Sequence, residues 1–316
     1  MIEVDNLHKH FGAKVAVDGV SFTVNKGEVL GFLGPNGAGK STTMRMVTGF
    51  LPATEGNVSI GGADIEENEI AAKSKIGYLP EAAPLYSDMT VEGFLRFSAE
   101  MRGVPAGELS AAVNKAIETT FLEPVRHQSV DTLSKGYRHR TCFAQSIIHD
   151  PEVLILDEPT DGLDPNQKSE IRNLIRRMGE TKAIIFSTHI LEEVEAACTR
   201  AIIIDRGKVI ADGTPDELKG KSSNAGSVRL SAKGLAGSGI EAELGKLSEA
   251  REVRVEDSDD EGITARILPA KGKSAELGVA VSKLCKDKNL TVEELHVEEG
   301  RLDELFREIT KTDDQD

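Results

Sequence analysis

The sequence lacks any long apolar run, and no segment approaches the roughly 18 apolar residues that suggest a membrane-spanning helix. Its N-terminus, MIEVDNLHKHFG, also lacks the basic region followed by an apolar region that marks a secretory signal peptide. These two absences predict a soluble chain. Any role at a membrane would then require a separate membrane-spanning partner.

Cysteine and basic charge are also scarce. Cys142, Cys198 and Cys285 are far apart, odd in number and without the spacing of metal ligands. This pattern fits a reducing cytosol, where cysteine serves as a small apolar core residue. The sequence has 38 Lys and Arg against 53 Asp and Glu, a formal net charge of −15, whereas nucleic-acid-binding surfaces are normally basic. We therefore expect no nucleic-acid partner.

What the sequence does contain is a glycine-rich segment between an apolar run and a helical pattern. The apolar run Val29–Leu33 leads into GPNGAGKS, which fits the pattern GxxxxGK[ST] of phosphate-binding loops. The alternative, a glycine turn that arose by chance, is weak in this strand, loop and helix context. The residues predicted here to bind nucleotide are Gly34, Pro35, Asn36, Gly37, Ala38, Gly39, Lys40, Ser41 and Thr42.

Each residue type in this phosphate loop has a physical reason. Glycines allow several backbone N–H groups to converge on anionic oxygens. The helix that begins near Lys40 adds unpaired N–H groups and the positive end of its dipole. Lys40 would reach the β- and γ-phosphates, and the Ser41 hydroxyl would ligate Mg²⁺. The sequence thus predicts a site for a nucleoside triphosphate with magnesium.

A distant strand ends in two acidic residues. Val153–Leu156 is apolar throughout, which is typical of a strand buried on both faces, and it leads into Asp157 and Glu158. Ligands of open α/β sheets bind at the carboxyl ends of the strands. Following a phosphate loop, this pair predicts that Asp157 belongs to the magnesium shell and that Glu158 activates or orients water. The alternative is an ordinary solvated turn.

Composition and periodicity predict two domains. An α/β domain over 1–220 contains a helical insert at about 86–148. A small, polar linker over 221–227 follows. Residues 228–311 show the order β-α-β-β-α-β of a ferredoxin-like α+β domain, and residues 312–316 form an acidic tail.

Local signals predict several element boundaries. Short strands are expected over Ile2–Asn6 and Ser21–Val24, around a turn near Asp18 and Gly19. Thr90 is expected to cap one helix of the insert. Asp164 is expected to cap another helix, with Pro165 at its first position.

In this order, the motifs of residues 1 to about 220 closely resemble those of the ATP-binding subunits of ABC transporters. LSKGY stands at the family signature, which is usually LSGGQ, and DGLD matches the loop that crosses the dimer seam. We call Leu133–Tyr137 the signature segment and Asp161–Asp164 the seam loop. The resemblance implies that the signature residues act in trans, on nucleotide held by another subunit. These residues are Ser134, Lys135, Gly136 and Tyr137, and the seam loop consists of Asp161, Gly162, Leu163 and Asp164.

The resemblance assigns further roles. Phe11 matches the aromatic residue that stacks on adenine, with Val17 as a second nucleotide contact, although a Phe between strands is otherwise more often a core residue. Glu81 stands where the family usually has a magnesium-coordinating glutamine. The implied magnesium ligands are Ser41, Glu81 and Asp157. The implied catalytic residues are Glu158 and His189, which matches the family's switch histidine.

The same resemblance implies an architecture and partners. It implies a P-loop NTPase fold with an ABC-type helical insert and an antiparallel β subdomain. Two subunits, copies or paralogues, would form a head-to-tail dimer around two ATP molecules with Mg²⁺, and hydrolysis would drive a separate transmembrane permease. The chain would then be cytoplasmic, at the inner face of the cell membrane. The closest subgroup resembles drug-export and gliding-motility ATPases, which implies an exporter.

Four residues depart from the family pattern. Glu81 places a carboxylate where a neutral amide is usual, and Lys135 places a charge where glycine is usual. Tyr137 replaces the signature glutamine, and Asp161 adds a carboxylate at the seam. These departures leave Lys40 and the catalytic residues intact but make the rate of hydrolysis an open question.

Other functions stay open from the sequence alone. A soluble ABC-type ATPase acting on nucleic acid or ribosomes is disfavoured by the absence of a basic patch and of a long coiled-coil insertion. A regulatory module without hydrolysis is disfavoured by the complete catalytic set. The second domain could regulate, dimerise, bind a small ligand or serve as a structural appendage, and fold analogy does not choose among these.

Overall fold

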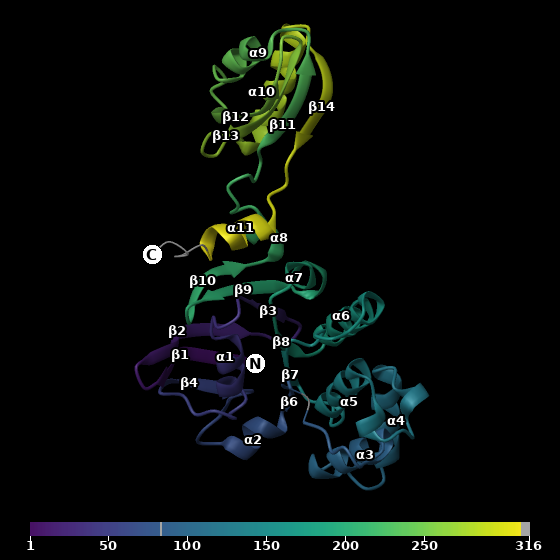
Figure 1. The fold of residues 1–316 in the computed structure, drawn as a ribbon. Coiled ribbons are helices and arrows are strands. Elements are labelled where there is room, and N and C mark those ends of the chain that lie inside the picture. The colour runs from purple at the N-terminus through teal and green to yellow at the C-terminus, as the bar shows by residue number, and fades with distance from the viewer. Residues whose placement is uncertain (83, 311–316) are drawn as a thin grey trace. The chain divides into compact units, whose positions relative to one another are not determined.

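The computed structural model describes residues 1–82 and 84–310, which form two compact units (Figure 1). The boundary between them in the sequence lies between Pro215 and Asp216. This division lies slightly before the domain end predicted at 220. The predicted acidic tail, 312–316, lies outside the described residues. The two units are described separately below.

The first unit is built on a six-stranded sheet with the order β10-β9-β3-β8-β7-β6. Neighbouring strands from β9 to β6 run parallel, and β10 runs antiparallel to β9. All residues of β3, β7 and β8 are buried, as expected for a parallel sheet covered on both faces. The strands are β3 (Val29–Leu33), β6 (Ile76–Leu79), β7 (Val153–Asp157), β8 (Ala183–Thr188), β9 (Arg200–Asp205) and β10 (Lys208–Gly213).

Successive residues of β7 enter two different cores, because side chains alternate across a strand. Val153 and Ile155 share a core with Met44 and Val47 of helix α1 (Lys40–Val47). Leu154 and Leu156 share the other with helix α6 (Pro165–Gly179). A further helix, α7 (Leu191–Ala197), contacts β3 and β8. The sheet is therefore clamped from both sides, which fixes the carboxyl ends of its strands.

A second, antiparallel sheet has the order β2-β1-β4-β5 and forms the predicted β subdomain. The strands predicted over Ile2–Asn6 and Ser21–Val24 are confirmed but belong to longer strands, and the turn predicted near Asp18 and Gly19 was wrong. The structure has a long hairpin whose turn lies at Gly12 and Ala13, and Gly19 lies inside β2 with a φ of +71°. Register shifts between the two strands show that Gly19 serves an irregular ladder and not a turn. The strands are β1 (Ile2–Phe11), β2 (Lys14–Val24), β4 (Glu55–Ile60) and β5 (Ala63–Asp64).

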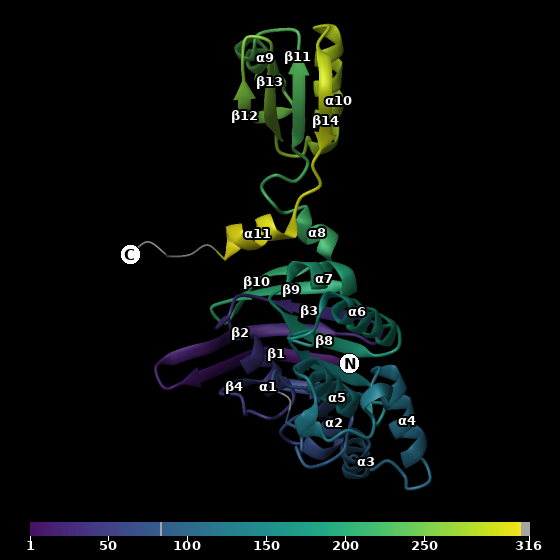
Figure 2. The same ribbon diagram turned by 45° about the vertical axis from the view of Figure 1, so that its right-hand side comes forward.

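The predicted helical insert is confirmed and has its own apolar core. Its first helix begins as expected, because the Thr90 hydroxyl accepts a hydrogen bond from the N–H of Gly93 at 3.1 Å. A 3-10 turn at Glu123–Val125 contains Pro124, which interrupts the helical pattern, and a second lies at Val130–Thr132. The helices are α3 (Val91–Met101), α4 (Leu109–Thr119) and α5 (Lys135–Ile147), and α2 (Glu69–Ser74) precedes the insert. Figure 2 shows the three insert helices grouped beside the sheet.

The second unit confirms the predicted order β-α-β-β-α-β. Its sheet has the order β12-β13-β11-β14 with antiparallel neighbours, and residues of both helices join a core with β11 and β13. This is the ferredoxin-like arrangement. The elements are α8 (Pro215–Lys219), β11 (Val228–Lys233), α9 (Gly237–Leu244), β12 (Ala250–Ser258), β13 (Gly262–Pro269), α10 (Ser274–Asp287), β14 (Thr291–Val297) and α11 (Leu302–Ile309).

The segment 221–227 is ordered by specific contacts and does not behave as the free linker that its composition predicted. Gly226 donates to the carbonyl of Glu298 at 2.9 Å, and the Ser227 hydroxyl bonds the carboxylate of the same residue. The Ser223 hydroxyl bonds Glu308. Small polar residues form these turns because their side chains satisfy neighbouring backbone and carboxylate groups. Among the described residues, no helix is long and apolar enough to cross a membrane.

Candidate nucleotide site

The phosphate loop connects β3 to α1 at the carboxyl end of the parallel sheet. Gly34 has no room for a side chain, because a Cβ there would lie 2.4 Å from the carbonyl oxygen of Ile204. Gly39 adopts a φ of +108°, and a Cβ would lie 2.6 Å from the carbonyl of Ala16. Glycine is thus required at both ends of the loop, for close packing and for backbone conformation.

Lys40 folds back into the loop. Its Nζ donates to the carbonyls of Gly34 at 2.7 Å and Pro35 at 3.2 Å, and the residue is 7% exposed. Burial lowers the pKa of Lys40, while the negative charges of Glu158, Asp157 and Glu81 oppose that shift. Three predicted site carboxylates therefore act on this one ammonium group. A cation held among backbone carbonyls at this position is suited to bind phosphate oxygens.

Asp157 is held by hydroxyls from two neighbouring segments. The Ser41 hydroxyl donates to Asp157 Oδ1 at 3.2 Å, and the Ser187 hydroxyl donates to the same oxygen. Asp157 Oδ2 is buried and has no partner among the described residues. A buried carboxylate oxygen is costly unless it binds a donor or a cation. Asp157 and Ser41 therefore fit a hard cation, for which oxygen ligands are preferred.

Glu158 and His189 meet directly. The Nδ1 atom of His189 lies 3.1 Å from each carboxylate oxygen of Glu158. Glu158 adopts a left-handed φ of +51°, a conformation that non-glycine residues rarely hold without support from surrounding contacts. Burial raises the pKa of Glu158, and the hydrogen bond to His189 acts in the opposite direction. The arrangement gives a half-buried carboxylate, next to Lys40 and Asp157, that can act as a base.

The signature segment and the seam loop lie together. Ser134 caps α5, and its hydroxyl accepts from the N–H of Tyr137 at 3.3 Å. Asp164 caps α6 as predicted, accepting from the N–H of Gln167 at 2.9 Å. A Cβ on Gly136 would lie 3.0 Å from the side-chain oxygen of Gln167. The starts of α5 and α6 are thus close, and a glycine at position 136 permits this approach.

Two departures from the family pattern pair with each other. The Nζ of Lys135 lies 2.7 Å from Oδ2 of Asp161 in the same chain. This contact is the main cause of a lowered pKa for Asp161. Tyr137, half-buried, packs against the insert core, and Leu163 is buried beside α6. Of the seam loop, Asp161, Gly162 and Asp164 are exposed and could meet a partner.

Phe11 and Val17, both predicted to contact the nucleotide, differ in exposure. Phe11 ends β1 beside the hairpin turn and is 50% exposed, with Lys9 Nζ 5.3 Å from its ring centroid. A core position for Phe11 is therefore wrong. Val17 is corrected to a core residue, because its side chain is fully buried and has no surface for a nucleotide. Its neighbour Ala16 contacts the loop through its carbonyl group.

Four buried polar residues behind the site were not assigned a role from the sequence. Ser187 stands opposite Asp157 in the pairing of β7 with β8. Glu193 is 1% exposed and accepts a hydrogen bond from Thr188 at 2.8 Å. It also bonds the hydroxyl of Thr160, which precedes the seam loop. A polar residue at the end of a strand was a usable signal for Ser187. A glutamate in a helix gave none, because such residues are usually solvated.

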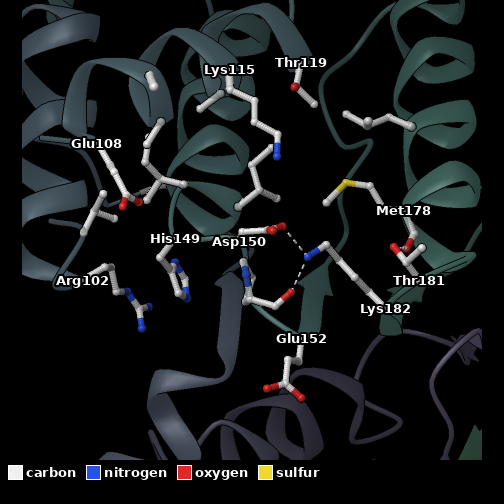
Figure 3. Close-up of a pocket in the computed structure, with 18 of the residues that line it drawn as sticks. Arg102, Glu108, Lys115, Thr119, His149, Asp150, Glu152, Met178, Thr181 and Lys182 are labelled. Carbon is white, nitrogen blue, oxygen red and sulfur yellow. Dashed lines mark hydrogen bonds and ion pairs between the residues drawn. The ribbon is translucent and has the colours of Figure 1, made fainter.

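A large cavity of the first unit lies elsewhere. It has a volume of about 1280 Å³ and is lined by α4, the ends of α5 and α6, and the residues that precede β7 and β8. Arg102, Lys115, His149 and the ion pair of Lys182 with Asp150 lie around it (Figure 3). None of the residues predicted for the nucleotide site lines this cavity. Cavity size therefore does not mark the nucleotide site.

Comparison with known proteins agrees with this geometry. The family model described as ABC transporter matches residues 17–161. The linearmycin resistance ATP-binding protein LnrL of Bacillus subtilis is 37% identical over 236 residues, which are 74% of this chain and 76% of that protein. The chain belongs to the ABC transporter family. It is an ATP-binding subunit of that family, and its activity is ATP hydrolysis.

Other relatives share the same region. The Nod factor export ATP-binding protein I of Ralstonia nicotianae is 37% identical over 219 residues, covering 69% of this chain and 68% of that protein. The probable multidrug ABC transporter ATP-binding protein YbhF of Escherichia coli is 39% identical over 225 residues. That match covers 71% of this chain but only 39% of YbhF.

Solved structures support the fold of this ABC subunit. The structure of an ATP-binding subunit of an ABC transporter matches with a TM-score of 0.65 and 29% identity, covering 69% of this chain and 92% of that one. The dimeric structure of a bacterial ABC transporter cassette matches with a TM-score of 0.64 and 22% identity, covering 68% of this chain and 99% of that one. At that identity, the second match shows the fold alone. The P-loop fold with its antiparallel β subdomain is therefore confirmed.

Proposed function

We propose that the chain hydrolyses ATP at the carboxyl end of its parallel sheet, with Lys40 binding the phosphates and Glu158 as the general base. The observation that carries this proposal is the convergence of Lys40, Asp157 and Glu158 with its partner His189. A carboxylate that acts as general base must lie near the attacking water, and a second group must hold that carboxylate in place. His189 provides the orienting contact.

Magnesium is the metal that fits these residues. Ser41 and Asp157 would hold it, and the unpartnered Oδ2 atom of Asp157 supports that assignment. Glu81 follows β6 and is exposed, and its charge acts on Lys40. It would become a further magnesium ligand when the nucleotide is bound. No cluster of three or more His, Cys, Asp or Glu suited to a metal occurs among the described residues. Few protein ligands are expected, because Mg²⁺ on a nucleotide is held largely by phosphates and water and screens their charge.

The active form in this proposal is a head-to-tail dimer with a second copy or a paralogous subunit. Ser134 accepts from the N–H of Tyr137, and the remaining N–H groups at the start of α5 would suit the γ-phosphate of ATP bound by the other subunit. A helix of this length offers a positive dipole end to an anion. Phe11 would stack on the adenine base in each subunit.

The dimer would drive a separate transmembrane permease at the inner face of the cell membrane, in the direction of export. Support comes from relatives whose names describe drug resistance and Nod factor export. A resemblance to gliding-motility ATPases stays a prediction from the sequence. The role of the ferredoxin-like unit also stays open.

The test is reconstitution with a membrane protein. The full chain would be co-expressed with a polytopic membrane protein encoded beside it, and the pair purified in lipid. We expect co-purification and stimulated ATP hydrolysis, both compared with Lys40→Ala. If the isolated chain hydrolyses ATP but binds no such membrane protein, the ATPase activity stands and the transport role is rejected.

A further inference from the structure

Two charged residues that depart from the family pattern are joined in this chain. The Nζ of Lys135, the first residue of α5, lies 2.7 Å from Oδ2 of Asp161, the first residue of the seam loop. The aliphatic part of the lysine covers Gly162, where a Cβ would lie 2.6 Å from the lysine Cδ. A side chain at position 162 would displace the lysine. The loop is therefore shaped to receive Lys135.

The seam loop is in turn attached to the catalytic glutamate. The N–H of Asp161 donates to the carbonyl of Glu158 at 3.0 Å. Because Glu158 holds a left-handed backbone conformation, its geometry depends on such surrounding contacts. A displacement of Asp161 would therefore act on the backbone that aims the Glu158 side chain.

Helix α5 meets this turn at a second point, one helical turn beyond Lys135. His139 is 5% exposed, and its imidazole lies near the backbone of Glu158. Its Nε2 atom is buried without a partner among the described residues. Burial lowers the pKa of His139, and the charges of Asp161 and Lys135 act on that pKa in opposite directions. Helix α5 is thus coupled to the Glu158 turn by one buried and one exposed contact.

We propose that Lys135 and Asp161 are a positioning pair, which transmits movement of the signature segment to the turn that aims Glu158. Each charge is tolerated at the seam only while the other is present. The inference rests on the proposed function, because a partner subunit and its nucleotide are what engage the signature segment. It adds a cis connection between two segments that act on different nucleotides.

Exposure argues that the pair does not serve the stability of the isolated chain. The Lys135 and Asp161 side chains are 70% and 52% exposed, and ion pairs in such surroundings contribute little to folding. At a closed seam, water would be excluded. A single charge left there would be costly, whereas removal of both would not. This asymmetry gives a measurable signature.

The test is a double-mutant cycle on the full chain with Lys135→Met, Asp161→Asn and the double variant. We expect each single change to lower kcat about tenfold and to leave the KM for ATP within about twofold. The double variant should recover to within about threefold of wild type, because contacting residues are not additive. Unfolding temperatures should agree among the variants.

A matched control is available on α2, where Lys73 and Glu69 form an exposed ion pair. Lys73→Met, Glu69→Gln and their double variant should leave kcat unchanged. A second measurement needs no ATP. Backbone hydrogen exchange over residues 158–163 should be faster in Lys135→Met, because the seam loop loses its ion pair with Lys135. It should stay at the wild-type rate in Lys73→Met.

The outcomes separate this inference from the proposed function. Additive effects of Lys135→Met and Asp161→Asn, or unchanged exchange over 158–163, would overturn the positioning pair. A double variant as slow as Lys135→Met alone would show instead that the lysine acts by itself. If the wild-type chain does not hydrolyse ATP, the proposed function fails, and the exchange measurement still decides whether Lys135 holds the turn.

Discussion

The two ends of the parallel sheet differ in a way that locates function. At the carboxyl end, β3, β7 and β8 deliver Lys40, Asp157, Glu158 and His189 to one place. At the amino end, the residues that precede β7 and β8 line a hollow of about 1280 Å³. The hollow is lined by charged groups, including the ion pair of Lys182 with Asp150, but by none of the residues predicted for the nucleotide site. In open α/β sheets, ligands bind at the carboxyl ends of the strands, so strand direction locates the site and cavity size does not.

The largest expected effect concerns Lys40. Lys40→Ala should abolish ATP binding in a fluorescence titration, because removal of a buried, hydrogen-bonded charge costs about 2–5 kcal/mol or more. Lys115→Ala, at the amino-end cavity, is the control and should bind ATP as wild type does. If Lys40→Ala binds ATP with unchanged affinity, the phosphate loop is not the nucleotide site. The two ends of the sheet would then not differ in function as described.

Next in size is Glu158. Glu158→Gln keeps the size of the side chain but lacks basicity, so we expect hydrolysis to fall roughly 10²–10⁴-fold while ATP binding persists. Without hydrolysis, ATP should hold two subunits together, and sedimentation should show a dimer with ATP but not with ADP. Glu152→Gln, beside the amino-end cavity, is the matched control. Wild-type turnover in Glu158→Gln would exclude a catalytic role.

A smaller effect is expected at Phe11. Phe11→Ala should weaken ATP by roughly 1–3 kcal/mol, the usual value of one base stack. ATP and GTP should bind wild type within a small factor of each other, because Phe offers no hydrogen-bonding group to a base. The measurement is nucleotide titration, with Phe50→Ala as an exposed aromatic control. Equal affinities of Phe11→Ala and wild type would leave the hairpin without a role in base binding.

Coupling to a permease should depend on the start of the insert. Tyr86 is 54% exposed, and its ring contacts Phe94 and Phe97. Tyr86→Ala or Met89→Ala should lower permease-stimulated turnover several-fold and spare basal hydrolysis, because the insert and not the phosphate loop is altered. ATPase assays with and without the permease would measure this. Loss of both activities together argues against a coupling surface.

The smallest effect belongs to the amino end. Burial lowers the pKa of His149 to about 4, from an ordinary value of 6.5. Between pH 6.5 and pH 4, His149 is therefore protonated in the unfolded chain but not in the folded chain. The free energy of unfolding should fall as the pH drops from about 6.5 to about 4. Because the ring is only partly buried, we expect about 1–2 kcal/mol. His149→Gln should remove this slope in denaturant titrations, and His10→Gln, on the exposed hairpin, should not.

Some features of the chain were predictable because their causes are local. The phosphate loop follows from glycine, lysine and serine within eight positions of sequence. The caps Thr90, Ser134 and Asp164 each accept from an N–H three residues away. Such interactions are complete within one helical turn, so residue order alone is enough to reveal them.

Other features needed the fold because their partners are distant in sequence. The extent of the N-terminal hairpin depends on irregular pairing across β1 and β2, which strand propensity does not report. The burial of Val17 depends on residues brought to it by the whole first unit.

The sequence by itself therefore determined the class of chemistry: a nucleoside triphosphate on a phosphate loop, with Asp157 and Glu158 opposite it. Tertiary structure alone decided how that chemistry is supported. It brought Ser187 to Asp157, His189 to Glu158 and Lys135 to Asp161. The physical reason is that local hydrogen bonds are encoded by residues within a few positions. Contacts between separate strands and helices exist only after the apolar cores have fixed those elements together.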